Sequence, residues 1–257
     1  MSNELQGMNV LVTRPEHQAE AFCHLVKSAG GQTIRFPAIE IQEIALDDKA
    51  EYALQKPSDC LIFISANAVR LGVNAIRNIA PDRLGQSRIM AIGKATAHEL
   101  ESNGIQPDLV PPSPYNSESL LAMPEMQDVS DRRFTIIKGK GGRAYLMEQL
   151  RARGGIVNEV DIYVRVKPQQ SNAALKELTE SQRAVVSITS VKGLHYLFEM
   201  ASVEQGEWLK QHAQFLVPGE RVADAVHDLH IQQAPIIAEN ATDAVMLQSL
   251  LQAIQLR

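Results

Sequence analysis

Apolar runs alternate with amphipathic segments along the whole chain. The first run, VLVT at residues 10–13, has the short continuous character of a strand that is buried on both faces. Pro15 suits the first position of a helix, and Gly30 suits its end. Between them, four apolar residues keep helical spacing: Phe22, Leu25, Val26 and Ala29. Strands that alternate with helices predict parallel sheets with helices on both sides.

The same pattern occurs twice. FTIIKG at 134–139 repeats the opening strand, and ARGGIVNEVDIYV repeats AGGQTIRFPAIEI. FISANAV corresponds to SITSVKG, MAIGKATA to FLVPGERVADA, and NSESLL to NATDAVM, always about 125 residues apart. Such constant spacing indicates an internal duplication. We therefore predict two similar α/β domains, each an open parallel sheet, with ligands bound beyond the carboxyl ends of the strands.

Basic residues gather in the turns between strands and helices. There are seven of them: Arg14, Lys94, Lys138, Lys140, Arg143, Lys192 and Arg221. Each alone is equally consistent with a solvated loop charge, but together they predict a site for a polyanion, because helix N-termini favour negative charge. Hydroxyl side chains begin helices in the same turns, as N-caps and as candidate ligand contacts: Ser65, Ser117, Ser190 and Thr242.

A dinucleotide-binding fingerprint is the main rival hypothesis. Gly139–Ala144 fits G-x-G-x-x-[GA] after a strand, and Glu159 follows twenty residues later. Against it, Glu159 lies within a predicted strand, and the matching turn of the first repeat has no glycine. An NAD(P)-dependent oxidoreductase stays open as an alternative. His227 and His230 have no carboxylate or thiol to complete a metal site, so we expect no metal.

Composition narrows the class of protein. The chain has 257 residues, 45% of them hydrophobic and 21% charged, with a net charge of −5, which argues against a nucleic-acid binder. It contains no apolar run of membrane-spanning length and no secretory signal, so we expect no membrane association. Cys23 and Cys60 lie in apolar surroundings, which is typical of buried thiols in a reducing cytoplasm.

Taken in order, these blocks resemble the uroporphyrinogen-III synthase family over about residues 8–250. The segments that carry the resemblance include VLVTRP, FISANAV, AIGKATA, GKGGRAYLMEQLRARGG, VDIYVR, ITSVKG and VPGERVADA. The resemblance implies two α/β domains joined by a two-stranded linker, with the active site in the cleft between them. One domain would comprise residues 1–37 and 170–257, the other 43–162, and the linkers 37–42 and 163–169. The opening segments of the two repeats would then be exchanged between domains.

The reaction implied by the resemblance is the closure of the linear tetrapyrrole hydroxymethylbilane to uroporphyrinogen III, in heme and siroheme biosynthesis. Ring D is inverted, water is lost and no cofactor takes part. The substrate carries eight carboxylates, which the basic turns would receive. We expect a cytoplasmic monomer with this small molecule as its partner, and no nucleic acid or membrane. The other alternative is a two-lobed module that binds an anionic ligand without catalysis.

Tyr163 matches the family's tyrosine near the linker. The resemblance implies that it assists departure of the hydroxyl, as a proton donor rather than a base, because an unperturbed phenol has a pKa of about 10. A half-buried strand tyrosine is an equal alternative. The residues implied to bind substrate, by side chains or main-chain amides, are Arg14, Ser65, Asn67, Gly93, Lys94, Ser117, Lys138, Gly139, Ser190, Lys192, Gly219 and Thr242.

Overall fold

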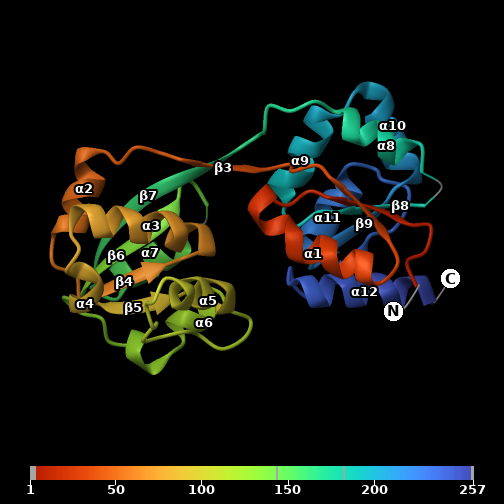
Figure 1. The fold of residues 1–257 in the computed structure, drawn as a ribbon. Coiled ribbons are helices and arrows are strands. Elements are labelled where there is room, and N and C mark those ends of the chain that lie inside the picture. The colour runs from red at the N-terminus through yellow and green to blue at the C-terminus, as the bar shows by residue number, and fades with distance from the viewer. Residues whose placement is uncertain (1–3, 143, 182, 256–257) are drawn as a thin grey trace. The chain divides into compact units, whose positions relative to one another are not determined.

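The chain forms two compact units in a computed structural model that describes residues 4–142, 144–181 and 183–255. Unit 1 comprises Met1–Glu40 with Val166–Arg257, and unit 2 comprises Ile41–Arg165. Each unit is built on one five-stranded sheet (Figure 1). The fold class is therefore α/β with predominantly parallel sheets, as the alternating pattern predicts.

The sheet of unit 1 combines strands from both ends of the chain. Its strands are β1 (Asn9–Val12), β2 (Gln32–Arg35), β8 (Ala184–Ser187), β9 (Gln214–Pro218) and β10 (Ile236–Ala238). They lie in the order β10-β9-β8-β1-β2, and every neighbouring pair is parallel. The carboxyl ends of all five strands therefore meet at one edge of the sheet.

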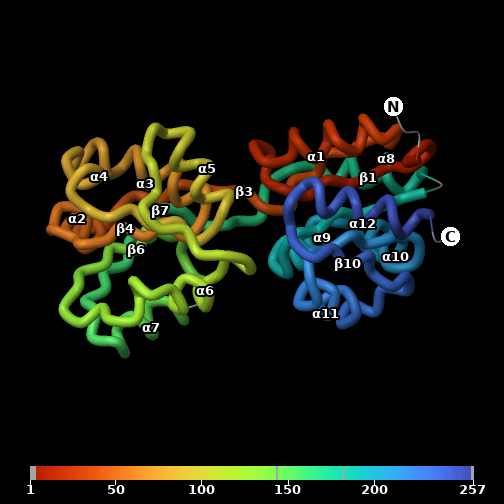
Figure 2. The backbone as a smooth tube through the Cα atoms, turned by 90° about the horizontal axis from the view of Figure 1, so that it is seen from below, coloured from red at the N-terminus to blue at the C-terminus, as the bar shows by residue number. Residues whose placement is uncertain are grey.

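Helices cover both faces of this sheet. Leu11 packs on one face, whereas Val10 and Val12 pack on the other, because successive strand residues point in opposite directions. Helices α1 (Glu16–Ser28) and α12 (Asp243–Gln255) lie side by side over Val10 and Val12 (Figures 1 and 2). The opposite face is covered by α8 (Ala173–Thr179), α9 (Val191–Met200), α10 (Val203–His212) and α11 (Glu220–Asp228).

Unit 2 has the same kind of architecture. Its sheet has the order β3-β7-β6-β4-β5, with strands β3 (Glu40–Glu43), β4 (Cys60–Phe63), β5 (Arg88–Ala91), β6 (Arg133–Gly139) and β7 (Ile156–Val166). The neighbours β7, β6, β4 and β5 are parallel. One face packs against α2 (Asp48–Gln55), α3 (Ala66–Ile79) and α5 (Lys94–Ser102), and α4 (Arg83–Gln86) lies near β5. The other packs against α6 (Ser117–Leu121), η1 (Pro124–Met126) and α7 (Tyr145–Ala152).

Each sheet draws strands from both halves of the chain. The order β2-β1-β8-β9 in unit 1 corresponds to β7-β6-β4-β5 in unit 2. Strand β1 therefore lies beside β8, and β6 beside β4, although the two members of each pair are far apart in sequence. The chain passes from one unit to the other after Glu40 and again after Arg165.

The helix starts confirm part of the sequence prediction and correct the rest. Ser65 and Ser190 are N-caps, since their hydroxyls accept from the amides of Ala68 and Gly193. Ser117 is the first residue of α6 and not its cap. Asn116, one residue before Ser117, caps that helix instead. Its side chain accepts from the Ser119 amide, and the Ser119 hydroxyl accepts from the Asn116 amide.

The start of α1 also differs from the prediction by one position. Pro15 precedes the first helical residue, with extended backbone angles (φ −48°, ψ 141°). The helix ends at Ser28, and Gly30 follows its C-cap as predicted, with a φ of +88° that glycine adopts without strain. Among the helices of the described ranges, none is both long enough and apolar enough to cross a membrane.

Candidate functional site

Most of the predicted site residues lie in turns at the carboxyl edges of the two sheets. In unit 2, Ser65 and Gly93 are the N-caps of α3 and α5 after β4 and β5, Asn67 and Lys94 lie in the first turns of these helices, and Gly139 is the last residue of β6. In unit 1, the turns after β1, β8, β9 and β10 carry Arg14, Ser190, Lys192, Gly219 and Thr242. Parallel strands bring these turns together at one edge of each sheet, which is where α/β proteins bind ligands.

A β-bulge sets the direction of the Tyr163 side chain. Lys138 is paired with Asp161, but the next residue, Gly139, is paired with Tyr163, so Ile162 is an extra residue in β7. Consecutive residues of a regular strand point to opposite faces, yet Ile162 and Tyr163 belong to the same core cluster. The bulge has therefore turned Tyr163 toward the face that carries α3 and α5.

Tyr163 is buried among its neighbours, with 1% of its surface exposed. Its hydroxyl lies 3.0 Å from Ser65 Oγ and accepts a hydrogen bond from a terminal nitrogen of Arg165 at 2.9 Å. The Arg165 guanidinium also lies over the ring, with Cζ 5.2 Å from the ring centroid. The ring occupies the space beside Gly139, where a Cβ atom would come within 2.5 Å of Cε2 and Cζ. The tyrosine therefore depends on glycine at 139.

The turn after β5 makes a second cluster in unit 2. The Nζ atom of Lys94 lies 5.2 Å from the centroid of the Tyr115 ring, a cation–π arrangement. A Cβ on Gly93 would lie 3.0 Å from the Cβ of Tyr115. Tyr115 has a φ of +56°, which is rare for a bulky residue and typical of functional or tightly packed segments. Asn67 is buried in the first turn of α3.

Lys138 is placed differently from the other predicted binding residues. It is buried, and its ammonium lies 2.8 Å from an Asp161 oxygen and 3.4 Å from a Glu159 oxygen. Glu159 also accepts from Arg151 at 2.8 Å. Burial raises the pKa of Glu159, but its interactions with Arg151 and Lys138 outweigh burial and hold that pKa below its usual range. The Lys138 charge is therefore neutralised within unit 2, which disfavours a side-chain contact with substrate.

The segment Gly139–Ala144 lacks the surroundings that a dinucleotide fingerprint needs. Glu159 is held in the ion pairs just described, in the middle of β7, so it is not free to bind a ribose. Gly141 and Gly142 have φ values of +77° and +94° with open space beside them, and α7 begins only at Tyr145. Lys140 is exposed, and Arg143 lies outside the described residues.

In unit 1, Arg14 joins two turns. Its guanidinium donates to Asp243 at the start of α12 and, at 2.9 Å, to the carbonyl of Ala241. The same group lies 5.1 Å from the centroid of the Phe22 ring. The Arg14 side chain is only 11% exposed, and its ion pair with Asp243 connects α12 to the β1–α1 turn. Its charge is thus matched by Asp243, which the sequence analysis did not identify.

The other predicted residues of unit 1 offer main-chain groups as well as side chains. Ser190 caps α9, and Lys192 in its first turn is exposed, 5.3 Å from the Tyr196 ring centroid. Gly219 has a φ of +70° and precedes α11 directly. Thr242 precedes α12 directly, and its hydroxyl donates to Asn240 at 2.6 Å.

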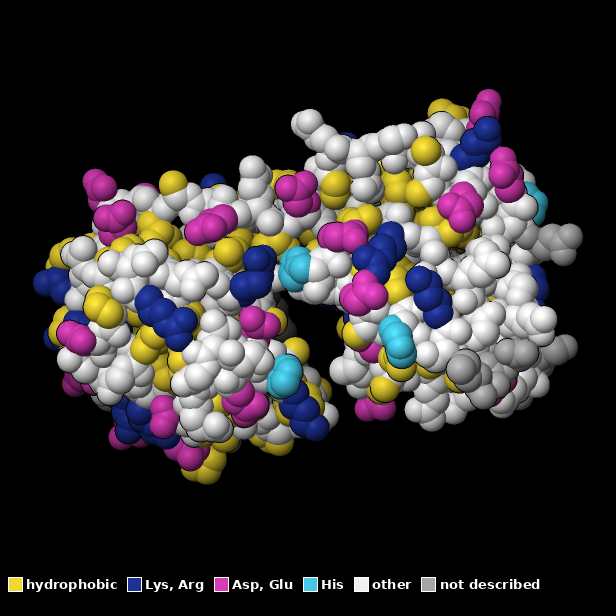
Figure 3. Space-filling model, viewed as in Figure 1, with side chains coloured by type: hydrophobic (Ala, Val, Ile, Leu, Met, Phe, Trp, Pro, Cys, Tyr) yellow, Lys and Arg dark blue, Asp and Glu magenta, His cyan; other side chains and the backbone are white. Residues whose placement is uncertain are grey.

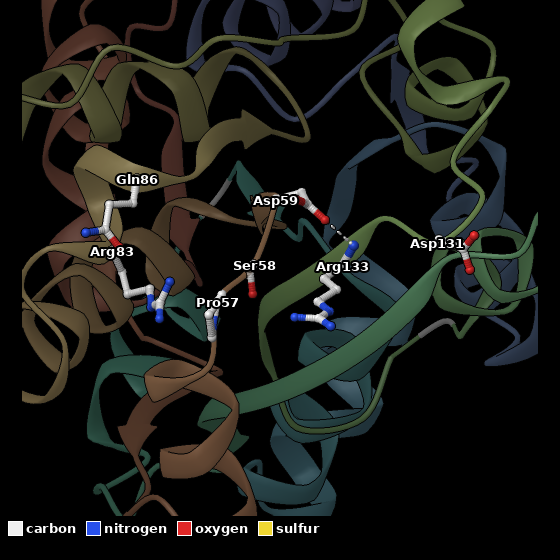
Figure 4. A pocket seen from close by; sticks show the side chains of 7 residues that line it. All are labelled: Pro57, Ser58, Asp59, Arg83, Gln86, Asp131 and Arg133. Carbon is white, nitrogen blue, oxygen red and sulfur yellow. Dashed lines mark hydrogen bonds between the residues drawn. The ribbon is translucent and has the colours of Figure 1, made fainter.

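A hollow of about 460 Å³ lies at the opposite edge of the unit 2 sheet (Figure 4). It lies near the amino ends of β4 and β6, and Ser58, Asp59, Arg83 and Arg133 are among its lining residues. The Arg133 amide donates to Asp59 there at 2.7 Å. This is the edge that open parallel sheets rarely use for ligands, so we do not assign the substrate to it. On the face in Figure 3, basic and acidic side chains are intermixed over both units.

Comparison with known proteins decides the family. A family model described as uroporphyrinogen-III synthase HemD matches residues 20–248. The chain belongs to the uroporphyrinogen-III synthase family. The uroporphyrinogen-III synthase of Escherichia coli (strain K12) is 29% identical over 248 residues, which cover 95% of this chain and 100% of that protein.

Solved structures of the uroporphyrinogen-III synthase family share the fold. A mutant uroporphyrinogen III synthase from Thermus thermophilus has a TM-score of 0.64 at 19% identity, covering 97% of this chain and 100% of that one. The uroporphyrinogen-III synthetase of Helicobacter pylori 26695 has a TM-score of 0.66 at 13% identity, with the same coverage. The α/β architecture read from the sequence is therefore the architecture of this family.

Three residues of the site were missed by the sequence analysis: Arg165, Tyr115 and Asp243. Arg165 could have been found, because it follows Tyr163 by two positions in the expected two-stranded linker and so shares its direction. Tyr115 and Asp243 carried no such signal, because their partners Lys94 and Arg14 lie in other turns.

Proposed function

We propose that this chain closes hydroxymethylbilane to uroporphyrinogen III, with inversion of ring D and release of water. The observation that carries the proposal is membership of the uroporphyrinogen-III synthase family over residues 20–248. The activity is that of a cyclising hydro-lyase that needs no cofactor. An NAD(P)-dependent oxidoreductase is disfavoured, because Glu159 is committed to Arg151 and Lys138.

The protein's task in this reaction is to control geometry and exclude water. Loss of the hydroxyl generates an electrophilic azafulvene, which attack through a spiro intermediate would resolve. The enzyme must hold the chain so that the inverted ring attacks before direct closure occurs, and it must shield the cation from water. Binding of the eight carboxylates by several turns would restrict the conformations of the flexible substrate.

We propose that the carboxyl-edge turns of each unit receive substrate carboxylates. Helix N-termini present free N–H groups and the positive end of the helix dipole, which favour anions. Lys94 and Lys192 add exposed charge in the first turns of α5 and α9, and Gly219, which is partly exposed, leaves the main chain before α11 without a side chain. The corresponding strand orders of the two units support a common origin by duplication.

Tyr163 is our candidate for the proton donor to the departing hydroxyl. Its own hydroxyl lies at the carboxyl edge, between the cap of α3 and the end of β6. Because only 1% of the Tyr163 surface is exposed, neighbouring residues must move before substrate can contact its hydroxyl. General-acid assistance of this kind contributes about 10²- to 10⁴-fold to a rate. We therefore expect Tyr163→Phe to bind substrate normally and to turn it over at least about 100-fold more slowly.

Isomer analysis of the product tests the proposal. The purified protein is incubated with hydroxymethylbilane, and the uroporphyrinogen isomers are separated after oxidation to porphyrins. Type III should predominate with protein present, and type I should form without it. Formation of type I alone, with folded protein present, would refute the activity. Tight binding of the bilane without any turnover would instead identify a binding module.

A further inference from the structure

We propose that Arg165 is a positioning residue that holds the Tyr163 hydroxyl in the state required to donate its proton. The inference rests on the proposed function, because it assigns Arg165 to the reaction through Tyr163. Arg165 is the last residue of unit 2, and its side chain is half-buried. Tyr163 and Arg165 both lie on β7, two positions apart.

Two contacts join the side chains. A terminal nitrogen of Arg165 donates to the Tyr163 hydroxyl oxygen at 2.9 Å, and the guanidinium lies over the ring with Cζ 5.2 Å from its centroid. Guanidinium groups are planar and donate from several fixed N–H groups, so one group can make both contacts. A lysine ammonium has no planar fork and would reproduce the charge without this geometry.

The hydrogen-bonding capacity of the Tyr163 hydroxyl limits which of its neighbours can donate and which can accept. A phenol has one proton and two lone pairs. Arg165 has no acceptor, so it must occupy one lone pair. Ser65 Oγ lies 3.0 Å away and accepts from the Ala68 amide. Either hydroxyl of this pair can donate, and we assign the donor role to Ser65, whose proton then occupies the second lone pair. The Tyr163 proton is then left for a third partner, which we assign to the substrate hydroxyl.

Arg165 also supports the charge that forms during the step. The carbon–oxygen bond of the hydroxymethyl group breaks, its electron pair leaves with oxygen, and the Tyr163 proton converts that oxygen to water. The pyrrole nitrogen supplies electrons to the carbon and keeps its proton, so the ring becomes an azafulvenium cation. The phenolate left on Tyr163 is stabilised by the guanidinium and by the Ser65 hydroxyl. The proton released when the final carbon–carbon bond forms restores the phenol.

Arg165→Gln removes the charge and changes the donor. We expect kcat to fall about 10- to 100-fold, the factor that a hydrogen bond from a charged donor carries, with KM changed less than about threefold. Arg165→Lys should recover part of this loss. Arg151→Gln is a matched control, because Arg151 binds the same strand at a distance from Tyr163, through the Glu159 carboxylate and the Val157 carbonyl. It should keep the kcat of the unaltered protein.

A double-mutant cycle with Tyr163→Phe separates positioning from a structural role. Once the hydroxyl is absent, Arg165→Gln should lower kcat no further, and urea midpoints of the Arg165 variants should stay close to that of the unaltered protein. If Tyr163→Phe is slow but Arg165→Gln is unchanged, or if the two losses multiply, the inference about Arg165 is overturned and Tyr163 keeps its role. If Tyr163→Phe has full activity, the proton-donor proposal and the Arg165 inference both fail, while type III product would still support the proposed reaction.

Discussion

Replacing Gly139 by alanine would insert a carbon atom where the Tyr163 ring now lies. The new Cβ would be 2.5 Å from Cε2 and Cζ of the ring and 2.9 Å from its hydroxyl oxygen. Carbon atoms in contact are normally about 3.5–4.0 Å apart, so the ring must move by about 1 Å. The ring is buried in a closely packed core, and its movement would separate the hydroxyl from Ser65 and Arg165.

The expected loss of stability follows from these contacts. Overpacking of a core costs about 1–3 kcal/mol, and a neutral hydrogen bond such as that to Ser65 contributes about 1 kcal/mol. We therefore expect Gly139→Ala to lower the free energy of unfolding by about 2–4 kcal/mol, a sizeable part of the roughly 5–15 kcal/mol of a typical protein. The kcat should fall together with stability, because the same displacement moves the hydroxyl.

Urea unfolding followed by far-UV circular dichroism measures the first effect, and initial rates of type III formation well below the midpoint measure the second. Gly72→Ala is a matched control, since its Cβ would lie 2.6 Å from Ile137 Cγ2 in the same unit. It should lose stability but keep kcat. Gly85→Ala faces open space on α4 and should be neutral or slightly stabilising.

A rescue experiment tests the proposed cause. Tyr163→Ala removes the ring that the new Cβ would meet, so Gly139→Ala should cost less than about 1 kcal/mol in that background. Equal costs of Gly139→Ala in the two backgrounds would show that the tyrosine is not what the glycine accommodates. A Gly139→Ala protein with unaltered stability and kcat would refute the reasoning outright.

Three further predictions concern ion pairs. Lys138→Met should destabilise unit 2 by about 1–3 kcal/mol and leave KM unchanged. The expected loss is this small because the acidic partners of Lys138 are partly exposed to solvent. A raised KM with unaltered stability would instead place Lys138 at the substrate. The pKa of Glu159 is lowered in the folded protein, so its stabilisation is present above about pH 4.5 and is lost as pH falls through the folded value. Glu159→Gln should therefore lower the urea midpoint at pH 7, and this deficit should shrink as pH falls below about 4.5, whereas a deficit independent of pH would exclude the ion pairs as its cause. Arg14→Met and Asp243→Asn remove the same ion pair, so the double variant should be about as stable as the less stable of the two single variants. Additive losses of stability would contradict this expectation.

Much of the fold could be predicted from the chain because its signals are local. Apolar runs such as residues 10–13, helical spacing, the N-caps at Ser65 and Ser190 and the stop at Gly30 each depend on neighbouring residues. The order of these signals, repeated about 125 residues apart, was enough to indicate an α/β protein and its family. The turns that carry the candidate site follow from the same order, because parallel strands end at one edge.

The partners of individual site residues were decided by tertiary structure. Arg14 meets Asp243 across 229 residues, and Ser65 meets Tyr163 across 98. The bulge in β7 that directs Tyr163 toward Ser65 depends on the register with β6, which no local pattern records. Lys138 resembled its neighbours in the sequence as a basic turn residue, yet the register of β7 sets Asp161 and Glu159 beside it. Local sequence therefore determined which elements form and where their turns lie. Contacts between distant strands determined which side chains remain available for substrate, because the charges and hydrogen-bonding groups of a side chain are satisfied by its neighbours in space.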